Sequence, residues 1–115
     1  MSHKHRKRLT AKPKAHARVF AALGDRTRLS LVAKLCSGQP RSITQLSEDS
    51  KLTRQAITKH LAVLERAGIV RSAHAGRERL FEFDPEPIDE AKEYLDLVSA
   101  QWDQALSRFK AFLEK

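Results

Sequence analysis

Apolar residues recur at helical spacing over the first third of the chain. Between residues 14 and 23 they stand at Ala15, Val19, Ala22 and Leu23. This spacing predicts a helix that ends before Gly24. Asp25 can then cap a second helix, because its carboxylate can accept backbone N–H bonds at the helix start. We expect the buried face of that helix to consist of Leu29, Val32, Ala33 and Leu35.

Two shorter helices are predicted after the break at residues 37–40. Ser42 and Gln45 have the spacing of a capping box, so the third helix should begin there. Thr53 can cap the fourth, which should run to about Ala67, with Gly68 just beyond its end. Two short helices joined by a tight turn are typical of a helix-turn-helix.

The fourth helix is amphipathic. Its apolar face carries Ile57, Leu61 and Leu64, and its other face carries Gln55, Thr58, Lys59 and Ala62. A helix of this kind can pack by one side and present the other to a partner.

The period then changes from helical to alternating. Residues 69–74 and 79–83 read as two strands around a loop at residues 75–78. We expect Phe81 and Phe83 to share one face of this hairpin, while Leu80 departs from clean alternation.

The last segment carries the longest apolar repeat. Its members alternate at steps of three and four over four heptads: Ile88, Ala91, Leu95, Val98, Trp102, Ala105, Phe109 and Phe112. A helix of this length spans roughly 40 Å, which is longer than one small domain can cover. The repeat therefore favours pairing with another chain, and the alternative is a helix that lies across its own domain.

Charge is unevenly distributed along the 115 residues, whose formal net charge is +8. Residues 1–14 carry six Lys/Arg and no acid, and residues 51–80 carry seven against two. Residues 81–115 carry four against nine. The basic parts indicate a polyanionic partner, either nucleic acid or an anionic membrane surface.

Composition narrows the function further. The single Cys36 excludes an intramolecular disulfide and a multi-cysteine zinc site. No apolar run is long enough to span a bilayer or to follow the basic N-terminus as a signal peptide, so we expect a cytoplasmic protein without a membrane partner. The sequence contains no glycine-rich phosphate loop and no nucleophile placed beside a base, so we do not expect an enzyme.

Three ordered blocks resemble the ArsR family of winged-helix repressors. Residues 21–29 (AALGDRTRL) resemble the family's "ALxDPTRxxIL" opening, with Arg26 where the family usually has proline. Residues 52–70 (LTRQAITKHLAVLERAGIV) resemble its recognition helix, and Gly76-Arg77-Glu78-Arg79 with Phe81 and Phe83 is similar to its wing. The helix around Trp102 resembles that of the subgroup without metal ligands.

The fourth helix has the chemistry to read DNA from the major groove. Arg suits guanine, Gln suits adenine, and Lys or Thr can contact bases or phosphate. Arg77 lies at the wing tip, His74 and Arg79 are weaker candidates, and the N-terminal Lys4, Arg6, Lys7 and Arg8 could add phosphate contacts. The predicted DNA-binding set is Ser42, Thr53, Arg54, Gln55, Thr58, Lys59 and Arg77.

Metal sensing, which the family also includes, is not expected. The third helix has no cysteine, and residues 85–115 have no histidine. The histidines His3, His5 and His16 are assigned to a flexible arm, and no metal or other cofactor is predicted. We interpret Cys36 as a small buried hydrophobe and His60 as the partner in a structural hydrogen bond.

The sequence thus predicts a mainly α fold with a small β-hairpin wing, in the order α-α-α-α-β-β-α. Residues 1–13 form a disordered basic arm, residues 14–86 the winged helix-turn-helix, and residues 87–115 a dimerisation helix that pairs through Leu95, Val98, Trp102 and Phe109. The preferred function is a homodimeric repressor that binds a near-palindromic operator in double-stranded DNA. A metal- or ligand-responsive sensor with an unidentified small-molecule effector and a protein-interaction module remain as alternatives.

Overall fold

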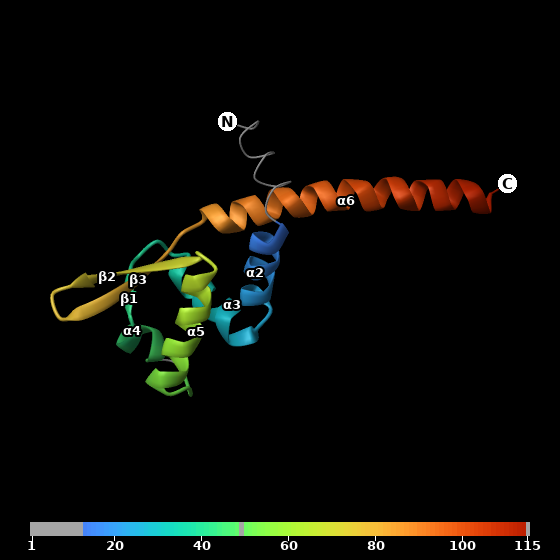
Figure 1. Ribbon diagram of the computed structural model, residues 1–115. Helices are drawn as coiled ribbons and strands as arrows, with labels where there is room; N and C mark the ends of the chain where they lie inside the picture. The colour runs from blue at the N-terminus through green and yellow to red at the C-terminus, as the bar shows by residue number, and fades with distance from the viewer. Residues whose placement is uncertain (1–12, 49, 115) are drawn as a thin grey trace.

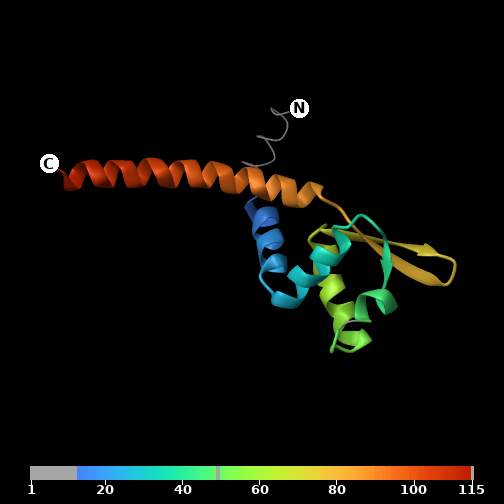
Figure 2. The ribbon, with the colours of Figure 1, turned by 180° about the vertical axis from the view of Figure 1, so that it is seen from behind.

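Among the described residues, seven helical and strand segments form one body, from which an eighth, a long helix, projects (Figures 1 and 2). The computed structural model describes residues 13–48 and 50–114. The elements in chain order are α2 (Pro13–Leu23), α3 (Arg26–Leu35), β1 (Arg41–Ser42), α4 (Ile43–Ser47), α5 (Arg54–Arg66), β2 (Val70–Ala75), β3 (Glu78–Phe83) and α6 (Glu86–Leu113). The predicted order of helices and hairpin is confirmed, with one strand added. The predicted arm at residues 1–13 lies outside the described residues, apart from Pro13.

Side-chain caps fix the starts of three helices where the sequence placed them. Asp25 Oδ2 accepts from the backbone N of Arg28 at 3.0 Å, at the start of α3. Thr53 Oγ1 accepts from the backbone N of Ala56 at 3.1 Å, at the start of α5. Ser42 and Gln45 form the predicted capping box of α4, with distances of 3.2 and 2.9 Å. Each cap satisfies a backbone donor that a helix start leaves unpaired.

The sheet has three antiparallel strands in the order β1-β3-β2. The hairpin pairs Ala75 with Glu78, so its loop is only Gly76 and Arg77, two residues shorter than predicted. Gly76 has φ +66°, which suits the first loop position of a type II′ turn. The strand β1 was missed because it has two residues and exists only through its pairing with Phe81 and Leu80.

The core joins one face of every helix to the inner face of the sheet. Its residues are Val19, Ala22, Leu31, Val32, Leu35, Leu46, Ile57, Leu61, Leu64, Ile69, Val70, Phe81 and Ala91. The apolar face predicted for α5 is confirmed, and Phe81 and Phe83 both contact the core.

The inner faces of α2 and α3 agree with the prediction at Val19, Ala22, Val32 and Leu35, which are buried, and differ at other positions. Ala15, Leu29 and Ala33 are exposed, whereas His16 and Leu31 are buried. The reason is that α2 packs against α6 and α5, and α3 packs against α5 and β3, so these neighbours decide which face is covered. His16, which was assigned to the flexible arm, instead lies in α2 and stacks on Tyr94 at a centroid distance of 4.8 Å. Cys36, predicted to be buried, is exposed just after α3.

The end of α5 is built around Gly68. The backbone N of Gly68 bonds to Glu65 O, and the backbone N of Ile69 bonds to Leu64 O, each at 3.0 Å. This is the pairing of a Schellman motif, and the φ of +79° at Gly68 suits it. A Cβ at Gly68 would lie 3.4 Å from Pro87, so α5, β2 and α6 meet closely here.

The helix α6 leaves the body after its first turns. Ala91 is buried and Ile88 packs against the core, whereas every described residue from 99 onward is exposed. Its 28 residues make it about 42 Å long, and Figures 1 and 2 show its C-terminal half extending clear of the other elements. Within residues 13–48 and 50–114, no helix is long and apolar enough to span a membrane.

Candidate nucleic-acid interface

Four polar side chains lie together at the N-terminal end of α5. Arg54, Gln55, Thr58 and Lys59, which we call the recognition face, are all exposed and line one shallow hollow with Ile43 of α4. The spacing explains their grouping, since residues three and four apart on a helix are neighbours. The structure therefore brings together four of the seven residues that the sequence predicted to bind DNA.

The recognition face keeps most of its hydrogen-bonding capacity for an external partner. Thr58 Oγ1 donates to the backbone carbonyl of Arg54 at 2.8 Å, which leaves the Thr58 oxygen as an acceptor. Arg54, Gln55 and Lys59 make no side-chain hydrogen bond or ion pair within residues 13–48 and 50–114. No carboxylate lines the hollow, so the face presents donors and positive charge.

Ser42 and Thr53 serve as helix caps, as described above. Ser42 is only 6% exposed, and its hydroxyl oxygen accepts from the backbone of Gln45. Thr53 is exposed at the start of α5, with its oxygen bonded to the backbone of Ala56. Both residues thereby fix the helices on which the recognition face stands.

Of the two arginines that the sequence suggested for the wing, one is exposed and the other makes hydrogen bonds within the protein. Arg77 is exposed in the loop between β2 and β3. Arg79, a weaker DNA candidate from the sequence, instead bonds to Ser72 Oγ through Nε and to Glu65 Oε1 through an Nη atom, each at 3.0 Å. Ser72 Oγ in turn donates to Glu65 Oε2 at 2.8 Å.

These three side chains form what we call the wing clamp: Glu65, Ser72 and Arg79. It connects the C-terminal part of α5 to both long strands, and the Arg79 guanidinium also lies 5.0 Å from the centre of the Phe81 ring. The clamp therefore fixes the wing, and with it Arg77, relative to α5. Sequence reasoning missed it because its members are 7 to 14 residues apart and only the folded sheet brings them together.

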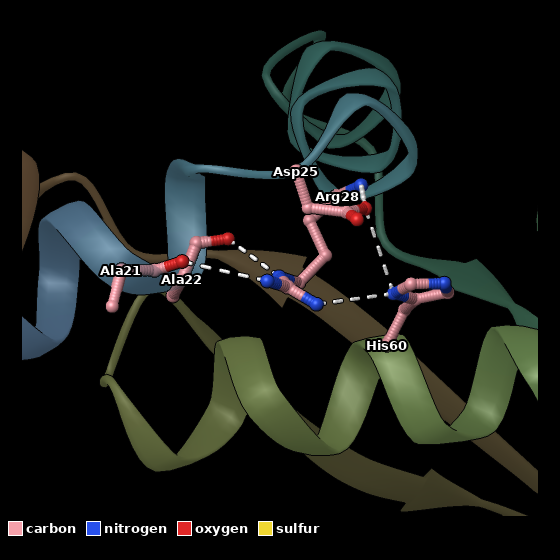
Figure 3. Close-up of polar contacts among 5 residues, drawn as sticks. All are labelled: Ala21, Ala22, Asp25, Arg28 and His60. Atoms are coloured by element: carbon pink, nitrogen blue, oxygen red, sulfur yellow. Dashed lines mark hydrogen bonds and ion pairs between the residues drawn. The ribbon is translucent and has the colours of Figure 1, made fainter.

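A second polar group connects the end of α2, the start of α3 and the middle of α5 (Figure 3). The Arg28 Nε donates to Ala22 O at 2.6 Å, one Nη donates to Ala21 O at 3.4 Å, and the other lies 3.3 Å from His60 Nδ1. Because a guanidinium can only donate, His60 Nδ1 is the acceptor and the ring proton lies on Nε2. The structural hydrogen bond predicted for His60 is confirmed.

Asp25 lies beside this group, with Oδ2 3.8 Å from His60 Nδ1 (Figure 3). The hydrogen bond from the backbone N of Arg28 lowers the pKa of Asp25, and the positive charge of Arg28 acts in the same direction. The carboxylate consequently stays ionised as the cap of α3.

The predicted dimerisation residues lie on the projecting part of α6 or near it. Leu95 is 50% exposed, Trp102 is 68% exposed and Phe109 is 59% exposed, while Val98 is half-buried. Leu106, Phe112 and Leu113 extend the same exposed apolar surface toward the C-terminus.

Among the described residues, no group of three His, Cys, Asp or Glu side chains is placed to hold a metal ion.

Comparisons with known proteins agree with this geometry. Residues 25–72 match the family described as bacterial regulatory protein, arsR family. The chain is 31% identical over 97 residues to the HTH-type transcriptional regulator Rv2034 of Mycobacterium tuberculosis, a match that covers 84% of this chain and 87% of the relative.

Solved structures give the same result for the fold. An ArsR-like transcriptional regulator from Rhodococcus sp. RHA1 superimposes with a TM-score of 0.76 and 32% identity, covering 86% of this chain and 92% of that one. The homodimeric winged helix-turn-helix DNA-binding domain Mb0332 from Mycobacterium bovis superimposes with a TM-score of 0.63 and 24% identity, covering 88% and 90%.

Proposed function

Since the chain belongs to the arsR family of winged helix-turn-helix transcriptional regulators, we propose that it is a homodimeric repressor of a near-palindromic operator. The recognition face enters the major groove, and Arg77 of the wing reaches the flanking minor groove or phosphate. Repression follows because the bound protein occupies promoter DNA. The observation that carries this proposal is the recognition face itself, an exposed row of donors without a carboxylate beside it.

The side chains of the recognition face divide by chemistry. Arg54 and Gln55, in the first turn of α5, have the paired donors and acceptors that discriminate guanine and adenine in the major groove. Lys59 adds a phosphate contact, and the Thr58 oxygen accepts from a base amino group. Ser42 and Thr53 act indirectly, by holding α4 and α5 at the angle that the groove requires.

Pairing through α6 explains the apolar surface that the body leaves uncovered. An exposed patch of Trp, Phe and Leu side chains marks an interaction site, and the heptad-like repeat suits a second copy of the same helix. A two-fold interface uses the same residues from both copies. It would present two α5 helices to half-sites about 10 bp apart, or a multiple of that spacing.

The test is DNA binding by the purified full chain at about physiological salt. The probe is DNA from the chain's own upstream region, compared with a scrambled fragment of equal length. We expect at least tenfold tighter binding to the upstream fragment, since low-salt attraction to any phosphate backbone is suppressed under these conditions. Binding to neither fragment would contradict the proposal in favour of a protein-interaction module.

A double variant locates the recognition surface. Arg54→Ala/Gln55→Ala should abolish the preference for the upstream fragment while the circular dichroism spectrum stays unchanged. The matched control is Arg66→Ala, which removes one positive charge from the far end of the same helix, about 18 Å away. Unchanged preference in the double variant would show that another element reads the DNA.

A further inference from the structure

A second hollow lies on the body, between α2, α3 and α5, and it is lined by three arginines. Its lining residues, which define what we call the arginine hollow, are Arg18, Ala21, Ala22, Arg28, Val63 and Arg66. The hollow has a volume of about 520 Å³, which is within the range of small-molecule sites. We propose that the arginine hollow binds a small organic anion, a carboxylate or a phosphate ester, distinct from DNA.

Among the described residues, Arg18 and Arg66 of the hollow have no acidic partner, whereas Arg28 is partly compensated by the nearby carboxylate of Asp25. No acidic residue lines the hollow within the part of the chain that the structure describes. On the sheet, by contrast, Arg71 and Arg79 pair with Glu82 and Glu65 at 2.9 and 3.0 Å. The three guanidinium groups around the hollow repel one another. A bound anion would be attracted to all three and would offset this repulsion.

Arg28 is held in place before any ligand arrives. Three of its five N–H donors go to Ala22 O, Ala21 O and His60 Nδ1, as Figure 3 shows. Two donors remain for an oxyanion, and carboxylate and phosphate suit a guanidinium because they accept two parallel hydrogen bonds. The nearby Asp25 does not line the hollow, and its Oδ2 is engaged by the Arg28 backbone N.

The walls and position of the hollow define the ligand class. Ala21, Ala22 and Val63 give it an apolar surface, which suits the carbon body of an organic anion. On α5, Val63 and Arg66 lie nine and twelve residues beyond Arg54, so the hollow is about 14–18 Å along the helix from that end of the recognition face. A ligand in the hollow would contact α2, which packs against α6. It would also contact Arg28, which bonds to His60 on α5. The hollow is therefore connected to the DNA-binding helix and to the proposed dimerisation helix.

Thermal unfolding of the full chain tests the site without DNA. Inorganic phosphate and phenyl phosphate are titrated at fixed protein concentration, with sodium chloride adjusted to hold ionic strength constant. We expect a saturable rise in Tm of about 5 °C at a ligand concentration near tenfold above Kd, with phenyl phosphate acting at the lower concentration. No rise with either anion would overturn the proposal.

Two variants separate this site from general basicity. In Arg18→Gln/Arg66→Gln, which changes exposed side chains, the anion-dependent rise in Tm should disappear. The matched control Lys92→Gln/Arg108→Gln removes two exposed positive charges from α6 and should keep it. A rise that survives in the first variant, or is lost equally in both, would contradict the arginine hollow as its origin.

A DNA arm distinguishes a free anion from the phosphate backbone. The salt dependence of binding to duplex DNA is compared between the wild type and Arg18→Gln/Arg66→Gln. An unchanged slope together with a lost Tm response supports the small-molecule site. A slope reduced by about two per protomer, and so by about four for a bound dimer, would assign the hollow to DNA and overturn the proposal.

Discussion

The body of the protein and the projecting part of α6 differ in the exposure of their large apolar side chains. In the body, Phe81 is 1% exposed and a single core joins the helices to the sheet. On α6, Phe112 is 70% exposed, and no element within residues 13–48 and 50–114 covers it. The same residue type is therefore buried within the chain in one region and left uncovered in the other.

This difference teaches where the stability of each region comes from. The body has caps, a core and side-chain clamps that are complete within one chain. The end of α6 carries the repeat of a paired helix, and its apolar face is left uncovered by the described part of the chain. Under the proposed dimer, stability in the body is independent of protein concentration, whereas stability along α6 depends on it.

The largest expected effect compares two phenylalanines. Phe81→Ala should lower the free energy of unfolding by about 3–5 kcal/mol at every protein concentration, because it opens a cavity in the core. Phe109→Ala should cause a loss that is full at high protein concentration and shrinks toward zero as the protein is diluted below the dimer Kd, since it weakens association and only the paired helix benefits from the contact. Urea unfolding at two protein concentrations measures both, and a Phe109→Ala loss that ignores dilution would refute the distinction.

The next effect concerns pairing itself. Leu95→Glu/Val98→Glu should convert the dimer to a monomer of 13.0 kDa, because charges would enter the apolar seam. DNA affinity should fall by about 100-fold or more, or roughly 2.7 kcal/mol, as one half-site contact is lost. Sedimentation equilibrium gives the mass. The control is Leu97→Glu, an exposed leucine about a third of a turn from that seam, and a double variant that remains dimeric would exclude this interface.

A smaller effect sharpens the picture of the body as a set of internal clamps. Arg79→Gln should weaken binding to the upstream DNA by about tenfold, or roughly 1.4 kcal/mol, because the wing loses its attachment to Glu65 of α5. Arg71→Gln on the same strand pair removes an equal charge and should have much less effect.

A double-mutant cycle identifies the mechanism of the Arg79 effect. Arg77→Ala should cost less affinity in the Arg79→Gln background than in the wild type, since a released wing no longer delivers Arg77 to the DNA. Strictly additive losses would mean that Arg79 acts only through its charge.

The smallest effect is a pH dependence at the start of α3. Asp25→Asn keeps a cap of similar strength but removes the charge. The pKa of Asp25 is lowered in the folded protein, so its ionised form stabilises the fold above the ordinary value of 3.8. We expect the wild type to be slightly more stable than the variant near neutral pH. That difference should vanish as pH falls through the lowered pKa, and thermal unfolding between pH 7 and pH 2 would detect it.

Local chemistry made much of the fold predictable. Asp25, Thr53 and the pair Ser42 and Gln45 were identified as caps because a cap depends only on residues three positions apart. The recognition face was predicted for the same reason, since helical spacing and residue type are both written in one short segment. The structure adds that its side chains are exposed and line a common hollow.

Long-range packing accounts for what was missed. The apolar faces predicted for α2 and α3 included Ala15, Leu29 and Ala33, which contacts with α5, α6 and β3 leave exposed, while the other predicted positions are buried or packed against the core. The strand β1 and the wing clamp likewise depend on partners far along the chain. The role of Arg79 could be guessed only from the glutamate and serine that the fold places beside it.

Pairing through the exposed end of α6 would also determine how steeply the amount of DNA-binding dimer depends on the total concentration of the protein. If two copies must meet along that helix before either can hold its half-site firmly, the concentration of the active form rises with the square of the concentration of single chains. A regulator that represses its own gene in this manner switches over a narrower range of abundance than a single-chain binder would. Under the proposed dimer, the exposed side chains of Trp102, Phe109 and Phe112 would set the concentration at which the regulator becomes active.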